Sequence, residues 1–113
     1  MQTAASEPID GVFRALADPT RRRVIERLGR SAASASELAA PFDMTLQSFS
    51  EHLKALEDAG LVTSRKKGRV RTYSLAPKGL QVVEDWLSAQ RTLWEQRLDQ
   101  LDDYLVKLKE TRS

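Results

Sequence analysis

The densest group of charged side chains in this 113-residue chain lies at residues 65–71. Five of those seven residues are basic: Arg65, Lys66, Lys67, Arg69 and Arg71. The whole chain has a formal net charge of only +2, so a local basic cluster predicts a specific anionic partner more than general attraction to anions. Taken alone, the cluster has an alternative interpretation as a solvated loop.

A second group of polar side chains precedes the basic cluster, on a predicted helix capped by Thr45. With about 100° of rotation per residue, the face opposite the apolar stripe carries Gln47, Ser48, Glu51 and Lys54, with Ser50 and His52 on its flanks.

These polar side chains have the chemistry to read or hold DNA. Gln47 can bond to N6 and N7 of adenine, and the serines can bond to base edges or phosphates. His52 and Lys54 suit phosphate, although a structural hydrogen bond at the helix edge is the alternative for His52. Glu51 is repelled by phosphate, so it would accept from a cytosine amine or pair with a neighbouring cation.

Several other kinds of site are excluded by composition. The chain has no cysteine and one histidine, which rules out disulfides and cysteine-ligated zinc and argues against a histidine-built metal site. No Ser/His/Asp set, phosphate loop or carboxylate pair stands out, so we expect no enzyme activity, no metal and no cofactor. No run of about 18 apolar residues occurs, and residues 1–7 lack the features of a secretory signal. We therefore expect no membrane association and a cytoplasmic location.

Two helices are predicted before residue 30. The first is indicated by an apolar stripe with i, i+3, i+4, i+7 spacing, formed by Ile9, Val12, Phe13 and Leu16. Asp18 and Pro19 predict the cap and first turn of the second, and Gly29 can end it. The core side of this second helix is expected to consist of Val24, Ile25 and Leu28. The run Arg21-Arg22-Arg23 opposes the helix dipole in the first turn, so it is either solvated or bound to an anion.

Two more helices are predicted between residues 34 and 60, after a connection of small residues at 32–36. Ser34 and Glu37 have capping-box spacing, and Pro41 helps to end the helix that they begin. The helix capped by Thr45 has an apolar face of Leu46, Phe49, Leu53 and Leu56. Gly60 occupies the place of a left-handed residue after a helix, and Leu61 can then contact Leu56.

The remainder of the chain predicts a hairpin and one long helix. β-favouring runs at 61–64 and 70–75 flank a turn centred on Lys67-Gly68. Pro77 opens a helix that can continue to about residue 110. Leu80, Leu87, Trp94, Leu101 and Leu108 recur every seven residues, Leu98 and Leu105 occupy the complementary position, and Glu84 and Arg91 interrupt the seam. The first helix can cover part of Leu80–Leu87, but so small a chain has little left to cover Trp94 through Leu108. We therefore expect a homodimer built on Leu87, Trp94, Leu98, Leu101, Leu105 and Leu108.

The order of these elements predicts a mainly α-helical winged helix-turn-helix fold with a long C-terminal dimerisation helix. The third and fourth helices are joined by three or four residues, and the basic hairpin that follows has the place of a wing. We expect one domain over 1–113, with a DNA-binding core at 9–78 and the dimerisation helix at 79–110. The predicted DNA contacts are Thr45, Gln47, Ser48, Ser50, Glu51, His52, Lys54, Lys66, Lys67, Arg69 and Arg71.

Three segments resemble the ArsR family of winged-helix repressors: 13–25 (FRALADPTRRRVI), 50–62 (SEHLKALEDAGLV) and 68–75 (GRVRTYSL). The resemblance covers about residues 9–78. It implies a dimeric transcriptional regulator, usually a repressor and in some members an autorepressor, that binds double-stranded DNA at a two-fold symmetric operator.

The resemblance does not extend to metal sensing. Many members bind metal through cysteines in the third helix, or through histidine and acidic residues in the last helix. Residues 37–42 (ELAAPF) offer no such ligand beyond Glu37, and the last helix has no histidine. Carboxylates alone suit soft metals poorly, which points to a metal-independent branch with an unidentified effector. The alternative function is a winged-helix module that binds protein and has little affinity for DNA.

Overall fold

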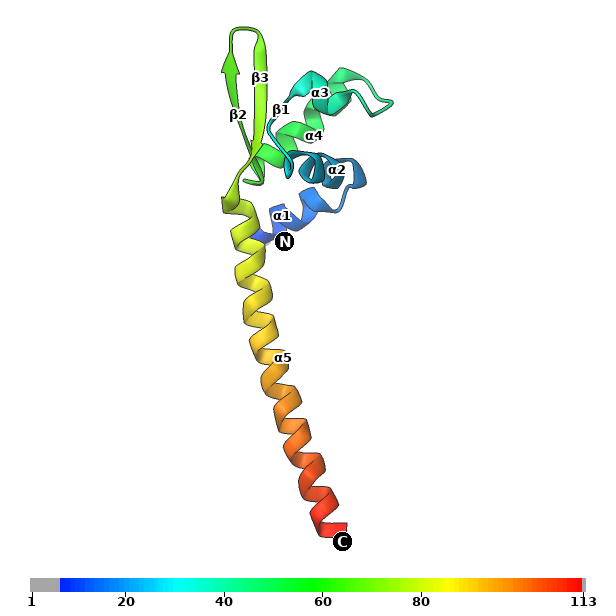
Figure 1. Cartoon of the computed structure of the whole chain (residues 1–113), viewed down its shortest axis with the longest axis vertical. Helices are drawn as coiled ribbons and strands as arrows, with labels where there is room; N and C mark the ends of the chain where they lie inside the picture. Colours follow the sequence, from blue (N-terminus) through cyan, green and yellow to red (C-terminus); the bar gives the residue numbers. More distant parts are fainter. Residues whose placement is uncertain (1–6, 113) are drawn as a thin grey trace, which may run out of the picture. The chain divides into compact units, whose positions relative to one another are not determined.

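The computed structural model describes residues 7–112, and within them the chain forms five helices and three strands (Figure 1). The elements are α1 (Pro8–Leu16), α2 (Pro19–Leu28), β1 (Ala33–Ser34), α3 (Ala35–Ala39), α4 (Leu46–Asp58), β2 (Val62–Lys67), β3 (Val70–Leu75) and α5 (Pro77–Arg112). The chain divides into two compact units between Val83 and Glu84, and each unit is described by itself. The predicted winged helix-turn-helix fold is confirmed.

The first helix turns most of its predicted apolar stripe to the core. Val12 is buried and Leu16 packs against the core, but Phe13 is 43% exposed and Ala15 is buried. Phe13 lies at the edge of the stripe, and apolar spacing alone did not indicate that the small Ala15 faces the core. Helix α2 begins as predicted, since the Asp18 side chain accepts a hydrogen bond from the Arg21 amide at 3.1 Å.

The small-residue connection contains a strand that the sequence did not predict. Ala33 pairs with Tyr73 and Ser34 with Thr72, which places β1 beside β3 in a three-stranded antiparallel sheet of order β1-β3-β2. A two-residue strand has no alternation to detect, and its partner lies about forty residues further along the chain. Helix α3 then begins with the predicted capping box between Ser34 and Glu37.

The turn between α3 and α4 is longer than the predicted three or four residues. Helix α3 ends at Ala39, so the connection covers residues 40–45. Ala40 still has helical dihedral angles, and Pro41 accounts for the end of the helix because it has no amide hydrogen to donate to the carbonyl four residues earlier. The connection is held by Phe42, whose ring lies 5.4 Å from the ring of Phe49 in α4.

Helix α4 ends as the sequence predicted. Gly60 has a φ of +76°, its amide bonds to the Glu57 carbonyl at 3.0 Å, and the Leu61 amide bonds to the Leu56 carbonyl at 3.0 Å. This pair of bonds defines a Schellman ending, and both leucines are buried. At the other end of α4, Leu46 is 71% exposed and does not belong to the predicted apolar face. It occupies the first turn, beyond the edge of the core.

The hairpin is longer than predicted and turns one residue later. Strand β2 runs to Lys67, which pairs with Val70, so the two-residue loop is Gly68-Arg69. Gly68 has a φ of +64° and Arg69 does not have a positive φ, as in a type II′ turn. Most of the basic cluster therefore lies within paired strands, and only Arg69 lies in the loop.

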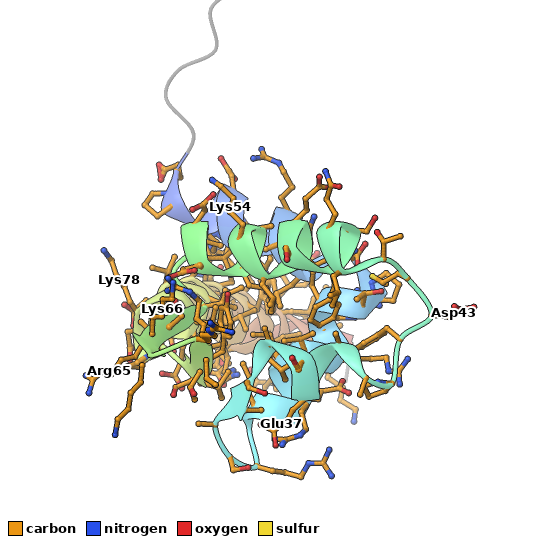
Figure 2. The ribbon with its side chains drawn as sticks, turned by 90° about the horizontal axis from the view of Figure 1, so that it is seen from above. Glu37, Asp43, Lys54, Arg65, Lys66 and Lys78 are labelled. Carbon is orange, nitrogen blue, oxygen red and sulfur yellow. The ribbon has the colours of Figure 1, made fainter. Side chains whose placement is uncertain are left out.

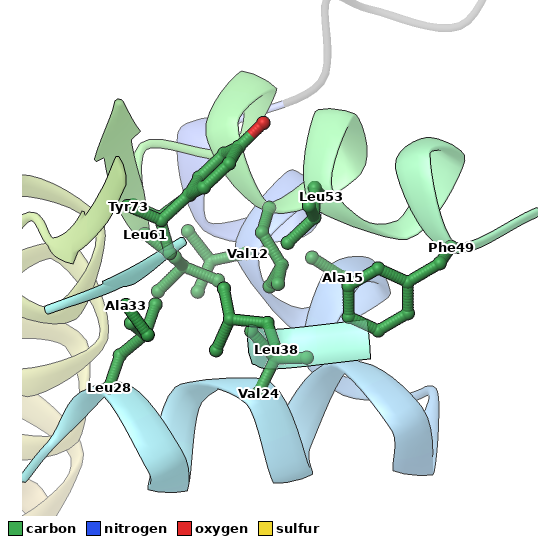
Figure 3. Packing of buried hydrophobic residues seen from close by; sticks show 12 residues of the cluster. Val12, Ala15, Val24, Leu28, Ala33, Leu38, Phe49, Leu53, Leu61 and Tyr73 are labelled. Atoms are coloured by element: carbon green, nitrogen blue, oxygen red, sulfur yellow. The ribbon is translucent and has the colours of Figure 1, made fainter. Parts of the chain in front are cut away.

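The core of the first unit lies where α1, α2, α3, α4 and the sheet meet (Figure 3). Each of these elements contributes between one and three buried apolar side chains, among them Val12, Val24, Leu38, Phe49, Leu53, Leu56, Leu61 and Tyr73. Burying a side chain of this size contributes roughly 1.5–3 kcal/mol, so both α4 and the hairpin are held by this core.

The first turn of α5 is joined directly to the end of α4. The Gly79 amide bonds to the Gly60 carbonyl at 2.9 Å, and the Ala76 amide bonds to the Leu61 carbonyl at 2.9 Å. A Cβ atom on Gly79 would lie 2.8 Å from the Gly60 oxygen and 3.0 Å from the Ala59 oxygen. The two backbones approach so closely that only glycine fits at position 79.

We expect Gly79→Ala to lower the free energy of unfolding by about 1–3 kcal/mol, because the added methyl group meets backbone that cannot move aside. Urea denaturation measures the effect. Gly11→Ala is the matched control, since a Cβ at Gly11 in α1 has no atom within 4 Å among the described residues. Equal stability of the two variants would contradict the close approach.

The second unit consists of the rest of α5, and its apolar side chains are exposed. Leu101 and Leu105 are each 51% exposed, and the other members of the predicted seam, Leu87, Trp94, Leu98 and Leu108, are exposed as well. Apolar exposure also extends beyond the seam, to Trp86, Leu93, Tyr104 and Val106. Within residues 7–112, no helix combines the length and hydropathy needed to cross a membrane.

Candidate nucleic-acid interface

The predicted polar face of α4 lies on the surface of the protein. Gln47, Ser48, Ser50, Glu51 and Lys54 are all exposed. Lys54 is visible on the outer side of α4 in Figure 2, away from α3 and the core. The geometry therefore leaves this face open to a partner, and the DNA contacts assigned to its residues remain predictions.

Thr45 and Ser48 form a local hydrogen-bonded pair at the start of α4. The Thr45 hydroxyl oxygen accepts from the Ser48 amide at 3.1 Å, and the Thr45 hydroxyl donates to the Ser48 hydroxyl at 3.0 Å. Thr45 is occupied by this capping role. Ser48 accepts in this pair, so its own proton can be donated to a phosphate or a base acceptor.

The exposed surface of α4 carries both positive and negative side chains. The Lys54 ammonium lies 3.4 Å from the Asp58 carboxylate one turn later, and both side chains are largely exposed. Such a surface pair contributes little to stability and is easily exchanged for a phosphate. Glu51 is exposed near the centre of the face, where the sequence predicted either a base contact or a cation partner.

His52 takes part in an intramolecular network at the edge of the face. Its Nδ1 atom accepts a hydrogen bond from Nε of Arg21 at 3.0 Å and lies 3.9 Å from an Asp18 carboxylate oxygen. The imidazole is 19% exposed. The structural alternative left open by the sequence is therefore present. Since Nδ1 is occupied, a DNA contact by His52, which remains a prediction, would have to use Nε2.

Asp18 links this network to the start of α2. Partial burial raises the pKa of its carboxyl group. The hydrogen bond from the Arg21 amide and the nearby His52 together lower the pKa by more than burial raises it, so the net pKa lies below the usual value. Asp18 therefore stays ionised as the cap of α2, and α2 is held against the edge of α4.

The arginine run at 21–23, which the sequence left as either solvated or bound to an anion, also makes contacts within the protein, while Arg22 and Arg23 remain exposed. Arg21 donates to His52, and a guanidinium nitrogen of Arg22 donates to the Leu16 carbonyl at 2.7 Å. The Arg23 guanidinium lies 4.6 Å above the centroid of the Phe42 ring. Each side chain thus joins α2 to another segment, which a run of identical residues could not reveal.

The basic residues of the hairpin are divided between its two faces. Lys66 pairs across the strands with Arg71 on the face that carries the buried Tyr73. Arg65 and Lys67 lie on the opposite face, because side chains alternate along a strand. The sequence suggested one cluster, but the strand register produces two basic rows with Arg69 at the tip.

Ser64 joins the hairpin to α4, and Arg71 is bonded to Ser64 within the hairpin. The Arg71 guanidinium donates to the Ser64 hydroxyl at 2.8 Å, and Ser64 donates to the Glu57 carboxylate at 3.0 Å. Burial and the nearby Glu57 charge raise the pKa of Tyr73 on the same face, and Arg71 partly offsets this. Sequence reasoning did not identify Glu57 or Ser64, since only the strand register brings them to Arg71. The DNA contact assigned to Arg71 stays a prediction.

The part of the chain that the structure describes contains no group of three or more His, Cys, Asp or Glu side chains placed to hold a metal ion. The arrangement that remains is a helix with an open polar face, held by hydrogen bonds at both flanks and followed by a hairpin with exposed cations. This arrangement suits a duplex with an anionic backbone and readable base edges.

Comparison with known proteins shows that this chain is similar to several transcriptional regulators. A family model described as a helix-turn-helix domain matches residues 16–65. The HTH-type transcriptional regulator Rv2034 of Mycobacterium tuberculosis is 42% identical over 74 residues, which cover 66% of this chain and 69% of that protein. The transcriptional repressor SdpR of Bacillus subtilis is 33% identical over 79 residues, which cover 70% of this chain and 88% of the repressor.

Two solved structures show the same fold with substantial sequence identity. The crystal structure of an ArsR family transcriptional regulator is 52% identical, covers 79% of this chain and 98% of its own, and has a TM-score of 0.76. An ArsR-like transcriptional regulator from Rhodococcus sp. RHA1 is 35% identical, covers 83% of this chain and 89% of its own, and has a TM-score of 0.71.

Proposed function

This chain belongs to the ArsR family of winged helix-turn-helix transcriptional regulators, and we propose that it represses transcription as a homodimer bound to a two-fold symmetric operator. DNA binding and transcriptional regulation follow from the family. The observation that carries the finer proposal is the open polar face of α4, joined to the basic hairpin through Glu57, Ser64 and Arg71.

The proposed docking places α4 in the major groove and the hairpin beside the duplex. Gln47 and Ser48 then face base edges from the first turns of α4. The Arg71–Ser64–Glu57 chain holds the hairpin at a set position relative to α4. Lys66, Lys67 and Arg69 lie beyond this anchor, where they can meet phosphates on either side of the groove.

The homodimer is supported by the exposed apolar residues of α5. Leu98, Leu101, Leu105 and Leu108 repeat at a/d spacing and are exposed in the single chain. A second copy presents the same seam, so a two-fold pairing would cover both. We further propose that the protein acts without metal, cofactor or catalytic activity and functions in the cytoplasm.

An electrophoretic shift with the DNA upstream of the protein's own gene tests this function. Binding measured at two salt concentrations should weaken steeply as salt rises, because cations on the protein displace counterions from the phosphates. Saturable binding that prefers this fragment to unrelated DNA supports the proposal. Weak binding without preference supports the alternative, in which the winged helix is a protein-binding module.

We expect Gln47→Ala to relax sequence preference and to leave non-specific binding nearly unchanged. Losing a bidentate contact should cost about 1–3 kcal/mol at one base pair and little at others. Competition between operator variants measures this effect. Gln100→Ala, an exposed glutamine in α5, is the matched control. An equal loss on operator and unrelated DNA would show that Gln47 only positions the helix.

A further inference from the structure

A cavity of about 380 Å³ lies between α2 and α3, outside the DNA-facing surface described above. Its volume falls within the range of roughly 300–1,000 Å³ that is usual for small-molecule sites. Val24 and Leu38 lie at its base but are almost fully covered, so its accessible apolar surface comes from Pro41 and Phe42, which are exposed and half-buried. Glu37 marks the α3 side of this region in Figure 2.

One wall of the cavity consists of three guanidinium groups. Arg23 and Arg27 are four residues apart and share one face of α2, and Arg30 follows in the turn after the helix. Two carboxylates, Glu26 and Glu37, also line the cavity, so its net charge is positive. Glu37 is committed to the cap of α3, because it accepts from the Ser34 amide at 2.8 Å.

The arginines differ in how strongly they are already held. Arg23 lies over Phe42, and Arg27 donates to the Ser31 carbonyl at 3.0 Å. The Arg30 side chain has no hydrogen bond or ion pair with any residue between 7 and 112. A guanidinium presents several donors in a planar fork that matches a carboxylate, so the wall is suited to a planar anion.

We propose that this cavity binds a small organic anion, a carboxylate carried on an aromatic or branched apolar body, and that this ligand is the effector of the protein. The carboxylate would meet Arg27 and Arg30, and the apolar body would lie against Phe42 and Pro41. A simple inorganic anion would make no apolar contact with Phe42 and Pro41, and the guanidinium wall disfavours a cation.

The side chain of Phe42 lies between the cavity and α4, the proposed recognition helix. Phe42 contacts Arg23 on the cavity side and the ring of Phe49, which is buried in α4, on the other side. A ligand that displaces Phe42 would break its contact with Phe49, and we expect the first turns of α4, where Gln47 and Ser48 lie, to shift with it. This regulatory step rests on the proposed function, whereas ligand binding by itself does not.

Titration of the isotope-labelled full chain with benzoate, followed by amide NMR shifts, tests the binding step without DNA. We expect saturable shifts at Arg27, Arg30 and Phe42, with a Kd of about 1 mM or tighter. Benzylamine has the same ring with the opposite charge, and inorganic phosphate has the charge without the ring. Shifts of similar size and affinity from either control would overturn the organic-anion assignment, as would the absence of saturable shifts with benzoate.

The double variant Arg27→Gln with Arg30→Gln should weaken benzoate binding at least about tenfold, a loss of 1.4 kcal/mol or more. Because Arg27 also bonds to Ser31, the single variant Arg30→Gln, which breaks no bond in the described structure, should weaken binding in the same direction. Arg14→Gln in α1 removes the same charge elsewhere and should leave binding unchanged. Equal affinity in all three variants would overturn the site.

DNA binding with the cavity saturated by benzoate tests the regulatory step. We expect the affinity for the operator to fall at least about threefold, and Phe42→Leu to abolish this response while the variant still binds DNA. Unchanged or increased DNA affinity would overturn the effector role. If Arg27→Gln with Arg30→Gln instead lowers the salt dependence of DNA binding, these arginines contact phosphates of DNA and the cavity assignment is wrong.

Discussion

Replacing Leu101 and Leu105 together with lysine is expected to yield monomers of 12.7 kDa and to reduce operator affinity at least about 100-fold. Both side chains are half exposed in the single chain. Burying one leucine contributes roughly 1.5–3 kcal/mol, so four seam leucines per chain provide a large association term even after the entropic cost of pairing. Two lysines at the centre of the seam would place positive charges in the dimer contact without a partner of opposite charge.

Operator affinity should fall together with the dimer because each half-site would then bind alone. A two-fold pair sets its two recognition helices about 34 Å apart, one turn of duplex, so that both can enter the major groove on one side. Sedimentation at micromolar concentration measures the mass, and a DNA shift with the same sample measures the affinity.

Gln96→Lys with Gln100→Lys is the matched control for the seam. These residues have the same i, i+4 spacing on the opposite side of α5, and both are exposed. This control should remain dimeric and bind the operator normally. A dimer of the Leu101 and Leu105 variant with normal DNA affinity would show that other surfaces build the assembly.

The combined variant Lys66→Ala, Lys67→Ala and Arg69→Ala is expected to weaken binding to all DNA sequences nearly equally. The slope of log affinity against log salt should flatten by up to about 3, one unit for each lost phosphate contact. Arg71 is left in place because its bond to Ser64 anchors the hairpin. If Arg71 were replaced as well, a weaker affinity could come either from a lost DNA contact or from a displaced hairpin.

Removing three cations that do not belong to the hairpin controls for net charge. Arg14→Ala, Lys107→Ala and Lys109→Ala lower the charge equally and should change the slope much less. An unchanged slope in the hairpin variant would mean that the wing does not touch DNA. The structure further predicts unequal single effects, since Lys66 and Lys67 lie on opposite faces of the hairpin.

Local chemistry in the sequence was sufficient for the helix ends. Asp18, Ser34 and Thr45 cap their helices as predicted, and the Schellman ending at Gly60 was predicted from the spacing of Gly60 and Leu61. These features depend on bonds between residues at most five positions apart, so the residue types carry the information. The exposed side of α4 followed in the same way from helical periodicity.

Features that depend on distant residues were missed or misplaced. The strand β1 exists only through its pairing with Tyr73 and Thr72. Phe13 and Leu46 have the right spacing for burial, but the core does not extend to them. The basic cluster divides into two rows because the hairpin turns at Gly68-Arg69, one residue later than the composition of the loop indicated.

The residue types and their local spacing thus specify the helices, their caps, the wing and the apolar seam of α5. Tertiary contacts decide how the candidate site is held. His52 meets Arg21 across 31 positions, Arg71 reaches Glu57 through Ser64, and Gly79 accommodates the backbone of Gly60. None of these side chains has a local signal for its partner, because such contacts are set when the buried apolar faces of several elements pack against one another.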